Sequence, residues 1–125
     1  MRGPKILIIS SDTGGGHRSA AAAIVAGVQK FFLGQSYAVR VIRAAEESHA
    51  MMQKLVNFYN WLLRNKQHWM KYLYWVVNRF RPETGGFFFN KATKYMGDIF
   101  ERWCPHVVVS VHPLSQHVMA RVLKN

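Results

Sequence analysis

Cysteine is nearly absent from this sequence. Cys104 is the one cysteine among 125 residues, so the chain can form neither an internal disulfide framework nor a cysteine-based zinc site. A reducing, intracellular environment is the simplest expectation for such a composition. The histidines give no metal site either, because His112 and His117 are spaced poorly for one helical face and no acid is close to them in sequence. We therefore predict no metal.

Acidic residues are scarce as well. The chain has 6 Asp and Glu against 17 Lys and Arg, which gives a formal net charge of +11. This imbalance predicts an acidic partner, which could be nucleic acid, an anionic membrane surface or a phosphorylated ligand. Half of the residues are hydrophobic and 14% are aromatic, which excludes a disordered chain. A length of 125 residues allows one domain at most.

Long apolar runs are missing. The longest stretch without Lys, Arg, Asp or Glu is 103–120, and it is interrupted by Pro105, Pro113 and several histidines. A membrane span needs about 20 mostly apolar residues, so we predict no transmembrane helix. The apolar run at 5–10 is followed by glycines instead of a cleavage site, which indicates a first core strand and not a signal peptide.

The order of the apolar patterns predicts an α/β fold. A buried strand at 5–10 leads through a glycine loop into a helix that ends near Gly34, and alternation over 37–42 predicts a second strand. The later elements that we expect are helices within 55–63, 69–80 and 88–103, a strand at 106–111 and a helix at 115–123. This order predicts a parallel sheet of at least three strands flanked by helices, with right-handed crossovers.

Gly14, Gly15 and Gly16 separate the first strand from the first helix. Glycines let the backbone turn tightly and approach a phosphate, and the start of the helix adds unpaired N–H groups. His17 and Arg18 supply an imidazole and a fixed positive charge there. The spacing fits neither the P-loop nor the dinucleotide fingerprint. The loop predicts a phosphate or nucleotide contact; the alternatives are a turn needed only for packing and a solvated or capping histidine.

Two motifs carry a resemblance to a known family. Residues 11–21, SDTGGGHRSAA, resemble the N-terminal signature of monogalactosyldiacylglycerol synthases and the related processive diacylglycerol glucosyltransferases. Residues 108–117, VVSVHPLSQH, resemble a second motif of that domain, a strand ending in Ser-x-His-Pro. The resemblance covers essentially the whole chain. It implies the Rossmann-like N-terminal half of a GT-B glycosyltransferase, with residues 1–125 as an acceptor- and membrane-side domain.

The resemblance also implies roles for individual residues. His17 would be the general base, which suits an imidazole that accepts the proton of an attacking alcohol. The donor diphosphate or an anionic lipid headgroup would contact Thr13, Gly14, Gly15, Gly16 and Arg18. The cleft would be supported by Asp12, which could orient the imidazole or cap the loop, and by His112, Pro113, Gln116 and His117. Galactose or glucose would pass from a UDP-sugar, the co-substrate, to diacylglycerol with inversion, and no further cofactor is expected.

The segment 48–82 is basic and aromatic and contains no acid. Tryptophan and tyrosine favour the headgroup layer of a membrane, and helices of this composition lie in the interface plane. The predicted membrane contacts are Trp61, Trp69, Lys71, Tyr74, Trp75, Arg79 and Arg81. The alternative is that the apolar stripes pack on the sheet while the charges are solvated. We expect half of each stripe to do so, drawn from Leu55, Leu62, Leu63, Leu73 and Val76.

Anionic membrane lipid and diacylglycerol are therefore the expected partners, and we expect peripheral binding at the cytoplasmic face of a membrane. Nucleic acid is not expected as a partner, because the sequence has no RNP, KH, zinc-finger or helix-turn-helix pattern. A non-enzymatic module that binds anionic lipid is the alternative function. We expect the UDP-sugar-binding domain to lie outside residues 1–125 and to be supplied in cis or in trans. We expect no glycosyl transfer by these residues alone.

The sequence departs from the family pattern at two positions. Many relatives carry an acid near the end of the second strand, where this chain has Arg43, Ala44 and Ala45. His106 stands where the family often has aspartate after proline. Details of the cleft are therefore expected to differ from those of the relatives.

Overall fold

The fold is built on a parallel sheet of three strands in the order β2-β1-β3. The computed structural model describes residues 3–13, 15–80 and 87–124. Strand β1, Lys5–Ile9, pairs with β2, Ala38–Ile42, on one side and with β3, Val107–Ser110, on the other. Leu7, Ile8 and Ile9 of the central strand have no exposed surface, which explains their continuous apolar run. The predicted parallel α/β fold is confirmed, and it is the architecture of the N-terminal Rossmann-like half of a GT-B enzyme.

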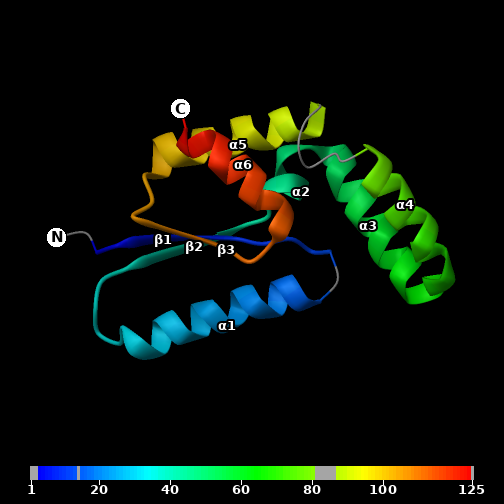
Figure 1. Ribbon diagram of the computed structural model, residues 1–125. Coiled ribbons are helices and arrows are strands. Elements are labelled where there is room, and N and C mark those ends of the chain that lie inside the picture. The colour runs from blue at the N-terminus through cyan, green and yellow to red at the C-terminus, as the bar shows by residue number, and fades with distance from the viewer. Residues whose placement is uncertain (1–2, 14, 81–86, 125) are drawn as a thin grey trace.

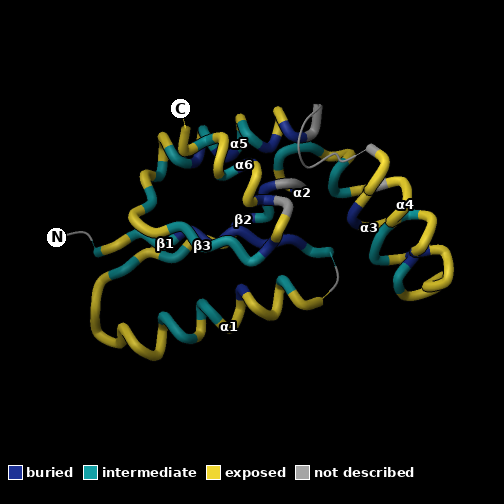
Figure 2. The backbone as a smooth tube through the Cα atoms, in the orientation of Figure 1, coloured by how far each residue is buried: buried dark blue, intermediate teal, exposed yellow. Residues whose placement is uncertain are grey.

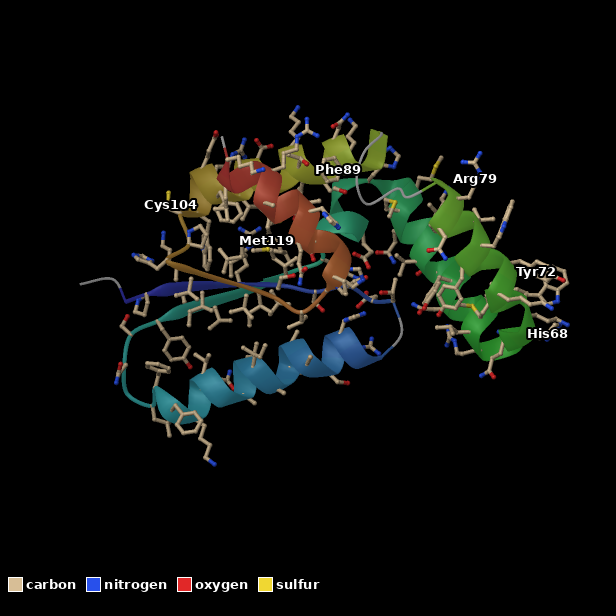
Figure 3. All side chains as sticks on the ribbon, viewed as in Figure 1. His68, Tyr72, Arg79, Phe89, Cys104 and Met119 are labelled. Atoms are coloured by element: carbon tan, nitrogen blue, oxygen red, sulfur yellow. The ribbon has the colours of Figure 1, made fainter. Side chains whose placement is uncertain are left out.

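Helices cover both faces of the sheet (Figure 1). Helix α1, Gly16–Phe31, lies on one face, while α5, Phe87–Trp103, and α6, Pro113–Leu123, lie on the other. The main core is on the side of α5 and α6, where Met119 points between α6 and the sheet (Figure 3). Its buried members are Leu7, Ile9, Ile42, Ala44, Phe89, Ala92, Met96, Ile99 and Val118.

The middle of the chain forms a helical hairpin to one side of the sheet (Figure 1). A short helix α2, Ala44–Ser48, is followed by α3, Ala50–Asn65, the single turn η1, Gln67–Trp69, and α4, Met70–Phe80. Helices α3 and α4 lie side by side (Figure 1). Burial, together with the interaction between Tyr59 on α3 and Tyr74 on α4, raises the pKa of Tyr59.

The apolar stripes of the hairpin divide between buried and exposed positions. Among the residues from which half were expected to pack, Leu62 is buried, while Leu55 and Val76 are exposed. Helix α3 packs on α2, and its buried residues are Val56 and Leu62, which is why the hairpin stands clear of the strands. Figure 2 shows how much of its outer surface is exposed.

Candidate functional site

The loops that follow the three strands meet at one edge of the sheet. Parallel strands bring their carboxyl ends to the same edge, which is where open α/β sheets bind ligands. Backbone bonds hold the loops together there, because the Ser10 N–H donates to the Ile42 carbonyl at 2.8 Å and the Val111 N–H donates to the Ile9 carbonyl at 2.9 Å. The two sequence motifs, about a hundred positions apart, thus become neighbours.

His17 is held by the loop after β3. Its Nδ1 lies 2.8 Å from the carbonyl oxygen of Val111, and since a carbonyl only accepts, Nδ1 carries the proton. In the neutral ring Nε2 then has a free lone pair and can accept a proton. Helix α1 has no side-chain cap, so His17 is not a capping residue. The side chain is partly exposed.

A second histidine packs against the first. The rings of His17 and His112 meet edge to face, with 4.5 Å between their centroids. His112 is only 8% exposed. Burial, followed by repulsion from His17, lowers the pKa of His112 below its usual 6.5, and the charge of Glu46 opposes this in part. His112 is therefore a neutral imidazole at neutral pH.

The loop after β1 is hydrogen-bonded to an acid that the sequence analysis missed. The Ser11 hydroxyl donates to Oε1 of Glu46 at 2.6 Å, and the Asp12 N–H donates to the same oxygen at 2.9 Å. Glu46 is 4% exposed and lies on α2. The second strand has no acid at its own end, but Glu46 of the following helix α2 is hydrogen-bonded to the loop after β1. Two adjacent glutamates in a chain so poor in acids were the available signal.

Thr13 connects this acid to the histidines. Its Oγ1 lies 3.1 Å from Ser11 Oγ and 3.2 Å from Nε2 of His112, and its N–H donates to Ser11 Oγ at 3.2 Å. Thr13 and His112, which come from opposite ends of the sequence, were both predicted as site residues, and the structure brings them together.

The carboxylate of Asp12 pairs with Arg43. The Arg43 guanidinium donates to the Asp12 carboxylate, and this hydrogen bond raises the pKa of Arg43. The backbone carbonyl of Asp12 accepts a hydrogen bond from Asn60 Nδ2 at 2.7 Å. Asp12 and Asn60 therefore join the loop after β1 to helix α3.

A polar cavity of about 430 Å³ lies between the glycine loop and α3. Two guanidinium groups and two carboxamides make it suited to an anionic or hydroxyl-rich ligand. Its lining residues are Asp12, Gly15, Arg18, Asn57, Asn60, Leu63 and Arg64. Gly15 and Arg18 were predicted to be site residues, whereas the contribution of α3 was not.

The glycines are not explained by packing. A Cβ added to Gly15 or Gly16 would meet no atom within 4 Å, and neither residue has the positive φ that favours glycine. The open space beside them is what a ligand that approaches the backbone would use. Gly14 lies outside the described residues.

The remaining predicted site residues begin α6. Pro113 is its first residue, and Gln116 and His117 are exposed on its first turns. Ser115 is buried, and its hydroxyl donates to the His112 carbonyl at 2.8 Å. It fixes the backbone of the second histidine and is a further residue that the sequence analysis did not name.

Comparison with known proteins gives a family. The family model for monogalactosyldiacylglycerol (MGDG) synthase matches residues 17–125. The chain belongs to the MGDG synthase family. A probable MGDG synthase from Glycine max is 33% identical over 97% of the chain and 23% of its own length, and one from Nicotiana tabacum is 32% identical with the same coverage.

MGDG synthase 1 from Arabidopsis thaliana is 33% identical over 99% of the chain and 24% of its own length. The chain thus spans less than a quarter of each of these relatives, all of which are named as chloroplastic. No solved structure matches it.

The helical hairpin of this family member presents aromatic and basic side chains to solvent. Four of the predicted membrane contacts are about half exposed or more: Trp61 (49%), Trp69 (54%), Tyr74 (53%) and Trp75 (67%). Lys71 and Arg79 are also exposed, whereas Arg81 lies outside the described residues. His68 and Tyr72 mark the outer end of the hairpin (Figure 3). With Trp69 and Lys71 they line an open cavity of about 500 Å³.

Two searches of the described residues bear on other classes of function. In the ranges 3–13, 15–80 and 87–124, no three His, Cys, Asp or Glu side chains are grouped so that they could hold a metal ion. Within those same ranges, no helix is long and apolar enough to cross a membrane.

Proposed function

We propose that this chain is the acceptor- and membrane-side part of a glycosyltransferase that moves galactose, or glucose, from a UDP-sugar to diacylglycerol. Membership of the MGDG synthase family supports the reaction class. A UDP-sugar-binding domain, in cis or in trans, completes the enzyme. The UDP-sugar is a co-substrate, and the proposal includes no further cofactor.

The hydrogen bond from His17 Nδ1 to the Val111 carbonyl carries the catalytic part of the proposal. It leaves Nε2 as the proton acceptor on a partly exposed ring beside the glycine loop. The sn-3 hydroxyl oxygen of diacylglycerol forms the new bond to the anomeric carbon while its proton passes to Nε2. The bond from that carbon to the UDP oxygen breaks, and UDP leaves with the electron pair. Attack from the face opposite to UDP inverts the carbon.

The cavity between the glycine loop and α3 is the place for an anionic group. Arg18 and Arg64 supply positive charge, and Asn57 and Asn60 supply carboxamides. The Asp12 carboxylate is paired with Arg43, so it opposes an anion less than a free carboxylate would. The donor diphosphate and a lipid headgroup share the chemistry that this cavity suits.

The hairpin of α3 and α4 is the proposed membrane contact. Its exposed tryptophans and Tyr74 suit the headgroup layer, and its lysines and arginines suit anionic lipid. We propose peripheral binding at the cytoplasmic face. The cavity beside the glycine loop is lined in part by α3, so a hairpin resting on lipid would bring the site close to its acceptor.

The test is glycosyl transfer by a protein that joins this domain to a UDP-sugar-binding domain. His17→Ala should lower turnover by roughly 10²-fold or more, while binding to lipid vesicles is retained. His106→Ala is the matched control, because His106 precedes β3 at the opposite edge of the sheet and accepts from the Lys5 N–H. Equal loss of turnover and vesicle binding in His17→Ala would make His17 structural and overturn the proposed role. Turnover by His17→Ala at the wild-type rate would overturn it as well.

A further inference from the structure

A chain of hydrogen bonds links the buried carboxylate of Glu46 to the imidazole of His112. It passes from Glu46 through the hydroxyls of Ser11 and Thr13 to His112 Nε2. The direction of each bond follows from counting hydrogens, since a hydroxyl has one hydrogen to donate and a carboxylate has none. The Ser11 hydroxyl donates its one hydrogen to Glu46. In the bond between Ser11 and Thr13, the Ser11 oxygen therefore accepts from the Thr13 hydroxyl.

The same count of hydrogens determines the tautomer of His112. The Thr13 hydroxyl donates its hydrogen to Ser11, so its oxygen accepts from Nε2 of His112 at 3.2 Å. Nε2 therefore carries a proton. Because burial and the neighbouring His17 keep this ring neutral by lowering its pKa, Nδ1 has the lone pair. His17 has the opposite tautomer, with its proton on Nδ1.

We propose that Glu46 is a positioning residue that holds His112, through Ser11 and Thr13, as the neutral Nε2–H tautomer against the ring of His17. The inference rests on the proposed function in one respect, which is that His17 acts as the base. A neutral ring at 4.5 Å between centroids leaves His17 free to become positively charged when it accepts a proton. A protonated His112 at the same distance would oppose that charge.

The placement of Glu46 supports a role beyond stability. A buried carboxylate carries a desolvation cost that hydrogen bonds only partly offset. Oε1 accepts two hydrogen bonds, but Oε2 is buried without a partner among the described residues. The nearby Arg43 pairs instead with Asp12 and, at 4.0 Å, with Glu47. The charge of Glu46 acts on Arg43 and on His112, but its hydrogen bonds go to the loop after β1.

Nitrogen-15 NMR of the histidine side chains in this chain, at neutral pH, tests the inference without lipid or UDP-sugar. The expected result for the wild type is Nε2–H for His112 and Nδ1–H for His17. In Glu46→Ala, Ser11 can turn its hydrogen to Thr13 and Thr13 can donate to His112 Nε2, so Nδ1–H should become populated at His112. Glu46→Gln keeps an acceptor oxygen and should restore the wild-type tautomer.

The same two variants distinguish the effect of the charge of Glu46 on the pKa of His112 from the effect of its hydrogen bonds on the tautomer. The negative charge of Glu46 raises the pKa of His112, so the pKa should fall in both Glu46→Gln and Glu46→Ala, although only the latter alters the tautomer. Glu47→Ala is the matched control: it removes the neighbouring glutamate on α2, which accepts from the Tyr95 hydroxyl at 2.5 Å and not from the loop. It should leave the tautomers of both histidines unchanged.

Ser11→Ala keeps the inference testable if Glu46→Ala fails to fold. It removes the hydroxyl between Glu46 and Thr13, and it should populate Nδ1–H at His112 in the same way. The inference is overturned if His112 is Nδ1–H in the wild type, or if both Glu46→Ala and Ser11→Ala keep Nε2–H as fully as the wild type. If the NMR shows the expected tautomers but the two-domain protein transfers no sugar, the proposed function is overturned and the positioning role of Glu46 stands.

Discussion

At the scale of single residues, substitutions of Gly15 and Gly16 test whether these glycines serve ligand binding or the packing of the turn. The structure has open space where their Cβ atoms would lie, so alanine there should cost little in folding. We expect Gly15→Ala and Gly16→Ala to change the free energy of unfolding by less than about 0.5 kcal/mol, as measured by urea denaturation. A loss above about 1 kcal/mol would show that the glycines serve the turn itself.

His112 should make the stability of the fold depend on pH. Burial and repulsion from His17 place the pKa of His112 below 6.5 in the folded protein, so the unfolded chain binds a proton more readily between that pKa and 6.5. The contribution of His112 to the free energy of unfolding is therefore fully present above pH 6.5 and should be lost as the pH drops toward the folded pKa. Urea denaturation between about pH 5 and pH 7.5 measures this dependence.

Two variants isolate the contribution of His112. His112→Asn should flatten the pH dependence in that window, whereas His117→Asn, at an exposed position on α6, should keep the wild-type curve. If the stability of the His112→Asn protein still falls as steeply as that of the wild type, another group is responsible.

The residue scale also shows where prediction from sequence ends. Thr13, His17 and His112 could be named because they lie in two compact motifs that follow strands. Glu46 and Asn60 could not, because their roles depend on α2 and α3 returning to the loop after β1. The sequence around Glu46 or Asn60 contains no pattern that predicts contact with the loop after β1.

Among the elements, the α3–α4 hairpin carries the membrane hypothesis. Each basic side chain near an anionic surface contributes about 1 kcal/mol, so Lys71→Gln and Arg79→Gln should each weaken binding to phosphatidylglycerol vesicles about fivefold at low salt. Lys94→Gln on α5 is the matched control, because Lys94 is an exposed lysine away from the hairpin. Partition measured by sedimentation distinguishes them, and equal losses in all three would indicate attraction by net charge alone.

Elements with a clear apolar pattern were predictable, including the short strands, whereas the short helix α2 was not. The helical spacing of apolar residues gave the bounds of α4 and α5 closely but only the inner part of α3. The alternation of β2 and the β-branched run of β3 gave their strands. Helix α2 has five residues, too few for periodicity to show. The stripes of α3 and α4 were recognised, and half of each was expected to pack. Spacing alone could not show which residues do so: Leu62 is buried, whereas Leu55 and Val76 are exposed.

At the scale of the whole molecule, stability depends on the face of the sheet that α5 and α6 cover. Met96 on α5 has no exposed surface and belongs to the main core. Met96→Ala should lower the free energy of unfolding by about 2–5 kcal/mol, measured by chemical denaturation. Met51→Ala, at a position that is 53% exposed, should cost far less. Similar losses in the two variants would place the core elsewhere.

The whole molecule combines a positively charged surface with a polar site. A net charge of +11 attracts DNA as readily as anionic lipid, and both attractions weaken with salt. Charge alone therefore cannot distinguish the two partners. The exposed tryptophans of the hairpin favour the membrane interface, but aromatic side chains also stack on single-stranded bases, so competition between the two ligands is needed.

Vesicle flotation of this chain, with neutral or phosphatidylglycerol-containing liposomes and single-stranded DNA as competitor, tests the central claim most directly. We expect flotation that requires the anionic lipid and persists with DNA present, together with a blue shift in tryptophan fluorescence from the hairpin. Flotation that fails with anionic liposomes, or that DNA abolishes, would contradict membrane docking by this domain.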